Sequence, residues 1–108
     1  MNKTEYDELV TEIIADLNLV TKSRYRVTAK TTRRVVQWLR QGYGLEEFKK
    51  VHRHKYMEWR DTESERFLQP ATLHAMSHFE DYLEASENVD LRKKVGVYIE
   101  KGNDEPPY

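Results

Sequence analysis

Apolar residues recur at helical spacing near the start of this chain. They fall at i, i+3, i+4, i+7, i+8 and i+11, which places them on one face of a 3.6-residue period. These residues are Tyr6, Leu9, Val10, Ile13, Ile14 and Leu17. The pattern predicts a helix from about Thr4, as its N-cap, to Leu19, with the stripe facing the core.

A second helix is predicted over residues 29–41. Thr28 is a suitable N-cap, and Gly42 suits the position just after the helix, where a left-handed backbone is favoured. One side of this helix is apolar, whereas the other carries Lys30, Arg33, Arg34, Gln37 and Gln41. The segment before it, around Tyr25, has no helical period and is predicted to be a short extended connector.

Two more helices complete the predicted core. The third runs from the Gly44–Leu45 step to about Arg60, and its apolar stripe includes His52, which we expect to be a core or boundary histidine. Lys55 lies on the same stripe, where its methylenes can cover the core while its ammonium reaches water. Pro70 suits the first turn of a fourth helix that runs to Leu83.

The pattern weakens after Leu83. Residues 88–91 suit the start of a short helix, whereas residues 95–99 suit an edge strand or a docked arm, and the sequence does not choose between these readings. Residues 102–108 are polar with two prolines and are predicted to be disordered. We therefore expect an all-α bundle of about four helices in residues 1–84, with the short connector, and a loosely attached extension in residues 85–108.

Composition narrows the function classes. A chain of 108 residues forms one domain with a modest core, which disfavours a large enclosed active site. The absence of cysteine excludes disulfides, thiolate metal sites and a cysteine nucleophile. No apolar run is long enough to cross a bilayer, and the amino terminus has no apolar signal segment, so we expect no membrane partner and a cytoplasmic location.

Charge is segregated along the chain although the net charge is only -1. Residues 22–60 carry twelve Lys and Arg against three acids, and both flanking segments are acidic. A basic band with interleaved aromatic residues is typical of nucleic-acid binding, but it also suits an acidic protein partner or an ordinary charged surface. Trp38 flanks the apolar stripe of its helix, so we expect it to be partly exposed, which favours binding. The candidate contacts to phosphate or partner are Arg26, Lys30, Arg33, Arg34, Lys50 and Arg53, and the candidate stacking residues are Trp38 and Tyr43.

A weak metal candidate occurs in the predicted fourth helix. His74, His78 and Asp81 fall at i, i+4 and i+7, on one helical face. Ala75 stands where a zinc-peptidase motif has glutamate, and no distant ligand is marked, so a solvated polar face is favoured and no metal or cofactor is expected. No catalytic motif appears elsewhere, and we predict that the protein is not an enzyme.

The order and spacing of residues 13–83 resemble the conserved carboxy-terminal domain of phage replication proteins of the DnaD-like, replisome-organiser kind. The residues that carry the resemblance are Ile14, Leu17-Asn18, Thr21-Lys22, Tyr25-Arg26, Gly42-Tyr43, Phe48, Val51, Lys55, Trp59, Leu68, Pro70, Thr72-Leu73, Phe79 and Tyr82-Leu83. The resemblance implies a phage or prophage origin and action in the cytoplasm of a bacterial host. The sequence departs from the family pattern at Gly44, Gln69, His74 and His78, and the last two imply that the histidine pair is not an inherited metal site.

Two functions follow from the resemblance and the charge pattern. The first is a non-enzymatic replication accessory module that binds DNA, or the host or phage replication machinery such as a helicase or its loader, through the basic helix face. The second is a small phage modulator that inhibits or redirects a host protein, a helicase loader or a defence nuclease, without binding DNA. Relatives carry this domain behind an amino-terminal DNA-binding domain, whereas Met1 here directly precedes the first helix, so we expect a free-standing copy. Single-stranded and double-stranded DNA both fit the first function.

Overall fold

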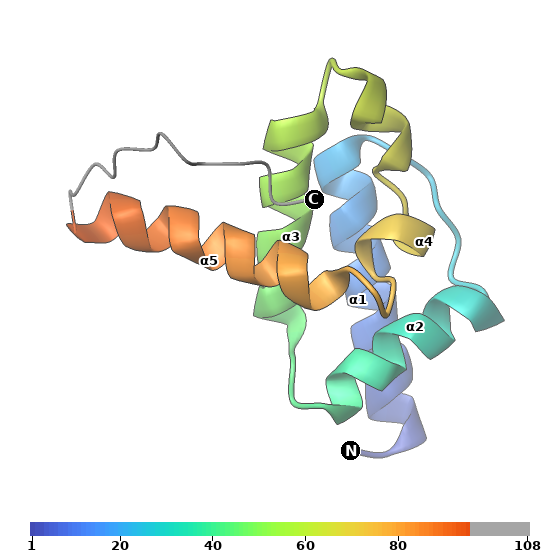
Figure 1. Ribbon diagram of the computed structural model, residues 1–108. Coiled ribbons are helices and arrows are strands. Elements are labelled where there is room, and N and C mark those ends of the chain that lie inside the picture. Colours follow the sequence, from blue (N-terminus) through green and yellow to red (C-terminus); the bar gives the residue numbers. More distant parts are fainter. Residues whose placement is uncertain (96–108) are drawn as a thin grey trace.

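The computed structural model describes residues 1–95, and the side chains of residues 1–88 (Figure 1). In this part of the chain all regular structure is helical: α1 Lys3–Thr21, α2 Ala29–Arg40, α3 Leu45–Trp59, the 3-10 helix η1 Glu63–Phe67, α4 Pro70–Leu73 and α5 Phe79–Val95. The all-α prediction is confirmed. The predicted strand or arm at residues 95–99 begins at Val95, which is the last residue of α5, and its other residues and the predicted disordered end lie outside the described residues.

Local capping signals explain where α1 and α2 begin. The side chain of Asn2 accepts the N–H of Glu5 at 2.9 Å and the side chain of Glu5 accepts the N–H of Asn2 at 2.9 Å, so α1 begins before the predicted cap, Thr4. The Thr28 hydroxyl accepts the N–H of Thr31 in the same way at 3.2 Å, which confirms Thr28 as the N-cap of α2.

The turn between α2 and α3 follows the sequence closely. Gly42 has φ of +103°, a conformation that L side chains rarely adopt, and its N–H donates to the carbonyl of Leu39 at 3.1 Å. Gly44 has no side chain to cap α3, so the carboxylate of Glu47 accepts its N–H at 2.7 Å instead. The predicted starts of α2 and α3 are therefore confirmed.

The connector between α1 and α2 is held by side-chain hydrogen bonds. The amide of Asn18 pairs with the backbone of Tyr25 twice, donating to its carbonyl at 2.9 Å and accepting its N–H at 2.8 Å. The hydroxyl of Tyr25 donates to the carbonyl of Leu68 at 3.0 Å. These bonds fix the connector, and with it the start of α2, against the end of η1.

The predicted fourth helix is wrong in its extent. Pro70 does occupy the first turn, but α4 ends at Leu73, residues 74–78 form turns, and α5 begins at Phe79. α5 then continues to Val95 and passes through the predicted domain boundary at residues 84–85 without a break. The division of the chain at that boundary stays a prediction.

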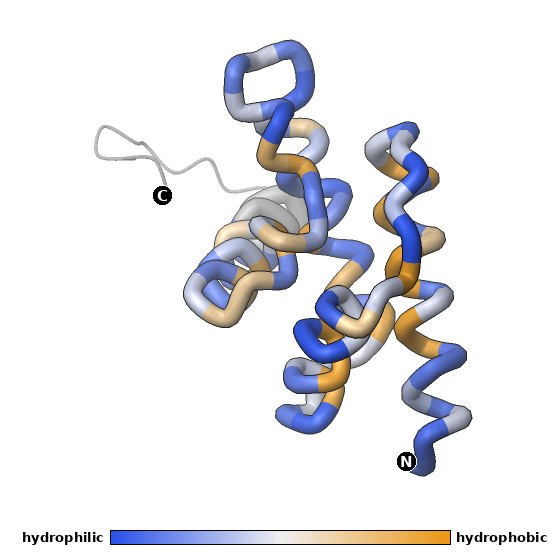
Figure 2. Tube along the Cα trace, turned by 90° about the vertical axis from the view of Figure 1, so that its right-hand side faces the viewer, coloured by the Kyte–Doolittle hydropathy of each residue, from blue (hydrophilic) through white to orange (hydrophobic). Residues whose placement is uncertain are grey.

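α3 is the central helix, with α1 and α5 packed against it (Figure 1). Figure 2 shows hydrophobic and hydrophilic positions alternating around α1, and a hydrophilic stretch at the top of the view, around η1. The predicted stripe of α1 is confirmed, since Val10, Ile13, Ile14 and Leu17 are buried. At the centre, Phe48 of α3 and Trp38 of α2 meet Phe79 of α5, with ring centroids 4.6 Å and 4.9 Å from it.

Lys55 departs from its predicted place. Its side chain is 0% exposed, with Nζ 4.7 Å from the ring centroid of Trp59 and 4.4 Å from that of Tyr82, and 2.7 Å from Glu58 Oε1. The expectation that the ammonium reaches water is therefore wrong, because two aromatic faces and a carboxylate replace its hydration. Burial lowers the pKa of Lys55, and the hydrogen bond to Glu58 opposes that effect.

Candidate nucleic-acid interface

The outer face of α2 and the end of the connector expose cations. Arg26, Lys30 and Arg33 are exposed and Arg34 is half-buried. Among the described residues, none of these four side chains lies within 4.0 Å of a carboxylate, the limit for an ion pair. Four of the predicted contact residues, three on α2 and one at the end of the connector, therefore have charge free to meet an anion, and we call this set the α2 face.

Two further residues on α2 extend this surface. Gln37 and Arg40 are exposed and stand four and seven positions after Arg33, so the three side chains share one side of the helix. They line a hollow of about 520 Å³ between α1 and α2, where Lys3 and Asp7 of α1 also lie. Neither residue was among the predicted contacts, although Gln37 was on the predicted polar face of this helix and Arg40 lies within the basic band of residues 22–60.

The predicted cations of α3 have a different setting. Lys50 Nζ lies 3.6 Å from Glu87 of α5, and Arg53 lies 3.9 Å from the buried carboxylate of Asp16. Lys49 Nζ, next to them, is 4.0 Å from Glu46. Each of these cations has a carboxylate within 4.0 Å, unlike the four cations of the α2 face.

The two predicted stacking residues are held in the core. Trp38 is 1% exposed and its Nε1–H donates to the carbonyl of His74 at 2.9 Å, so the prediction of a partly exposed ring is wrong. Tyr43 is half-buried with its ring edge-on to Phe79, and its hydroxyl donates to Glu80 at 2.7 Å. This hydrogen bond raises the pKa of the Tyr43 hydroxyl.

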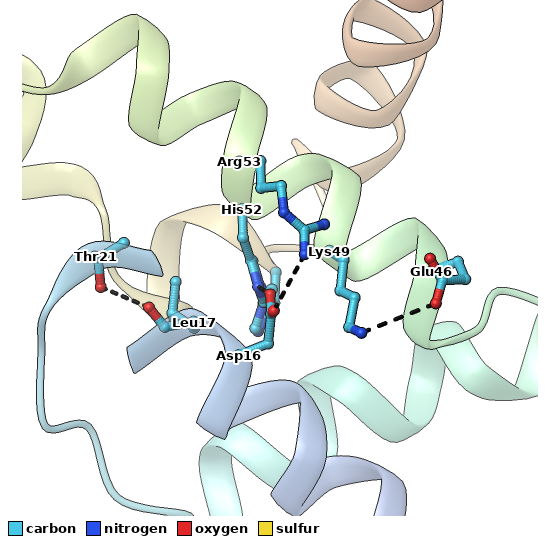
Figure 3. Close-up of polar contacts among 8 residues, drawn as sticks. Asp16, Leu17, Thr21, Glu46, Lys49, His52 and Arg53 are labelled. Carbon is cyan, nitrogen blue, oxygen red and sulfur yellow. Dashed lines mark hydrogen bonds and ion pairs between the residues drawn. The ribbon is translucent and has the colours of Figure 1, made fainter. Parts of the chain in front are cut away.

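Three ionisable side chains, Asp16, His52 and His74, form a hydrogen-bonded series in the core, next to Arg53 of α3. Asp16 of α1 points towards His52 and Arg53 of α3 (Figure 3). Oδ2 of Asp16 is 2.7 Å from Nδ1 of His52, and Nε2 of His52 is 2.8 Å from Nε2 of His74. Both imidazoles are 0% exposed, which confirms His52 as a core histidine.

The pKa directions and the hydrogen bonds together show which ring nitrogens of His52 and His74 carry a proton. Burial lowers the pKa of His52 despite the hydrogen bond to Asp16, and burial lowers the pKa of His74 further, so both rings are neutral near pH 7. Burial alone would raise the pKa of Asp16, but the hydrogen bond to His52 and nearby positive charges lower it overall. The carboxylate therefore accepts Nδ1–H of His52, and Nε2 of His52 accepts Nε2–H of His74.

Sequence reasoning missed Asp16 as part of this hydrogen-bonded series. The available signal was its position between Ile13 and Leu17 on the apolar stripe, where a charged side chain requires a buried partner. The second partner, His74, was assigned to a polar helix face. Its burial depends on α4 ending at Leu73, which the local sequence does not indicate.

The weak metal candidate is not assembled by the fold. His74 is the C-cap of α4 and points into the core, whereas His78 is exposed and its ring stacks on Tyr82 with centroids 5.5 Å apart. The predicted single helical face through Asp81 is therefore wrong. No group of three or more His, Cys, Asp or Glu residues in the described part of the chain is placed to hold a metal ion.

Comparison with known proteins gives one family. Residues 13–84, about two thirds of the chain, match the model of the family described as conserved phage C-terminus. The comparisons with curated proteins and with solved structures gave no match. Among the helices of residues 1–95, none is long and apolar enough to span a membrane.

Proposed function

The chain belongs to the conserved phage C-terminus family, and on that premise we propose that it is a non-enzymatic accessory module of phage DNA replication that binds DNA through the α2 face. The observation that supports this proposal is the set of four cations, Arg26, Lys30, Arg33 and Arg34, that have no acidic partner among the described residues. Lys and Arg that neutralise phosphates release counterions, which is the main source of non-specific affinity for DNA.

The buried Asp16–His52–His74 chain supports a role without catalysis. Its order of carboxylate and imidazoles is one that some hydrolases use to activate a nucleophile. Here both imidazoles are 0% exposed and are packed against the ring of Phe48, so neither can reach a substrate atom. We assign these three hydrogen-bonded side chains a role in the stability of the fold.

DNA binding is tested with an Arg33→Ala, Arg34→Ala variant. Fluorescence anisotropy with a labelled DNA fragment should show binding by the parent at physiological salt. In the variant, the dependence of log affinity on log salt should fall by about two units, because two phosphate contacts are lost. A parent that does not bind, or a variant that binds like the parent, contradicts the proposal.

A second candidate function is binding to a host or phage replication protein, such as a helicase or its loader, or to a defence nuclease. The observation that favours it is a hollow of about 510 Å³ at η1, α4 and the start of α5, with Trp59, Phe67 and Tyr82 among its lining residues. Phe67 is 38% exposed. Ser64 also lines the hollow, and its neighbours in sequence are the acids Glu63 and Glu65. An apolar hollow in a segment rich in acids suits a basic protein segment with an apolar anchor.

A pull-down from host lysate, with and without nuclease, separates the two functions. A partner that is stoichiometric, survives nuclease and is lost with Phe67→Asp favours the second function. If all captured protein is released by nuclease, the captured material is bridged by DNA and the first function stands alone.

A further inference from the structure

We infer that the nucleic acid that fits the α2 face is double-stranded DNA, held through its phosphate backbone. The inference rests on the proposed function and narrows it to one form of nucleic acid. It is carried by two features of the fold that act together: the aromatic rings near the basic residues are engaged in contacts within the protein, and three of the four cations are fixed along one rigid helix.

Binding to single strands depends on aromatic side chains on which unpaired bases stack, each worth about 1–3 kcal/mol. The four aromatic residues interleaved with the basic band are the natural candidates. Trp38 is buried under Phe79 and hydrogen-bonded to a backbone carbonyl. Tyr43 is edge-on to the same phenylalanine and is bonded to Glu80, whose charge repels a phosphate.

The rings of Tyr25 and Tyr56, and that of Tyr6 on α1, also make contacts within the protein. Tyr25 is half-buried and its hydroxyl donates to the carbonyl of Leu68 at 3.0 Å. Tyr56 is half-buried on α3, with the guanidinium of Arg60 at 5.9 Å from its ring centroid. Tyr6, the aromatic residue of α1, is half-buried and has Arg40 at 5.8 Å in the same way. Each of these rings is partly buried and already has a partner within the protein, so it is less available for stacking than an exposed ring.

The cations, in contrast, are arranged for a partner with fixed charges. Lys30, Arg33 and Arg34 lie within one turn of α2, and Arg40 lies two turns further, about 15 Å along the axis from Lys30. Both ends of α2 are fixed, by the Thr28–Thr31 capping box and by the turn at Gly42. A rigid row of charges is complementary to the regularly spaced phosphates of a duplex.

The dimensions of α2 are compatible with this partner. A helix with its side chains is about 10–12 Å across, close to the width of the major groove of B-DNA. Gln37, between Arg33 and Arg40, carries an amide that can bond to a phosphate or a base edge. Asp7, the acid that lines the adjacent hollow, is paired with Lys3 at 2.9 Å, so it does not oppose the approach of a phosphate.

The test compares a labelled duplex of about 20 base pairs, roughly two helical turns, with each of its separated strands, by anisotropy between about 50 mM and 200 mM salt. We expect the full chain to bind the duplex at least about tenfold more tightly than either strand. The duplex should give a salt slope of roughly −3 to −4, for four phosphate contacts.

Two charge-matched variants locate the contact. Arg33→Gln, Arg34→Gln should weaken duplex binding roughly tenfold and reduce the slope by about two. Lys49→Gln, Lys50→Gln on α3 removes the same charge from residues that face carboxylates and should change the affinity less than about twofold. Circular dichroism confirms that both variants remain folded.

Each outcome is decisive. Equal or tighter binding to a single strand overturns the inference but leaves the proposed function in place. Equal losses in the two variants overturn the assignment to the α2 face. If the protein binds neither form even at the lowest salt, the proposed function itself fails.

Discussion

Asp16 is a carboxylate within an apolar helical stripe, and the structure explains how the fold tolerates it. The side chain is 7% exposed and is hydrogen-bonded to His52, which is hydrogen-bonded in turn to His74. This chain joins α1, α3 and the end of α4 by polar contacts inside the core. Nδ1 of His74 has no hydrogen-bond partner among the described residues, so a lone pair there is buried without compensation.

Removal of Asp16 should destabilise the fold strongly. In Asp16→Ala, the Nδ1–H of His52 loses its acceptor inside the core, at a cost of roughly 2–4 kcal/mol in the free energy of unfolding. Urea unfolding followed by circular dichroism measures the change. Asp7→Ala is the matched control, because its pair with Lys3 is largely exposed and should contribute less than about 1 kcal/mol. Equal effects of the two variants would contradict the buried chain.

Stability should also depend on pH below neutrality. Burial lowers the pKa values of both His52 and His74 in the folded protein from the ordinary 6.5, so the unfolded chain binds more protons below that pH. Stability is therefore fully present above about pH 6.5 and falls as the pH decreases towards the folded pKa values. The lowered pKa of Asp16 adds a further loss below its ordinary value of 3.8.

Urea unfolding at a series of pH values between about 7.5 and 5 measures this dependence. His74→Gln should make the curve shallower, whereas His78→Gln, at an exposed position, should leave its slope unchanged. A parent whose stability is constant over this range would show that the two buried imidazoles are not neutral as assigned.

At the scale of the helices, local signals predicted some boundaries and tertiary contacts decided others. Thr28, Gly42 and Pro70 act within a few residues of their own positions, so the sequence alone located them. The end of α4 at Leu73 has a different origin. The carbonyl of His74 accepts from Trp38, and its ring meets His52, residues that lie 36 and 22 positions away. No pattern in the segment itself predicts that geometry.

The contrast between local signals and tertiary contacts also applies to the candidate site on α2. The basic side of α2 follows directly from helical periodicity, and Arg33 and its neighbours were predicted correctly as a polar face. Burial of Trp38 depends on Phe79 and His74, which reach it from other elements. The sequence therefore predicted the exposed cations of α2 but not the burial of Trp38.

The turn after α2 provides a test at this scale. Gly42→Ala should lower the free energy of unfolding by roughly 1–2 kcal/mol, because φ of +103° is unfavourable for an L residue even though nothing lies within 4 Å of the added Cβ. Gly44→Ala is the matched control. Its φ is −134°, and the added Cβ would meet only the flexible end of Glu47 at 3.4 Å. A cost at Gly44 equal to that at Gly42 would argue against the left-handed turn.

The whole molecule separates two surfaces of opposite charge on different elements. The α2 face carries its cations on α2 and the connector, whereas the hollow around Phe67 belongs to η1, α4 and α5 and lies in a segment rich in acids. Residues 61–81 contain five acids and one arginine. An overall charge of -1 therefore conceals two segments of opposite charge, which favour partners of opposite charge.

This separation predicts that the two surfaces can be inactivated independently. Phe67→Asp removes a ring that is 38% exposed and places a carboxylate in the apolar hollow, so it should abolish binding of a protein segment that anchors an apolar side chain there. The added charge lies at the end of η1, which is bonded to the connector next to Arg26, so affinity for duplex DNA should fall, but by less than in a variant that removes cations of α2 itself. Arg33→Gln, Arg34→Gln should give the opposite result. Anisotropy with a DNA duplex and a nuclease-treated pull-down, applied to both variants, measure the two activities on the same samples. If Phe67→Asp weakens DNA binding as much as the arginine variant does, the two surfaces form a single site, and the hollow is then part of the DNA interface.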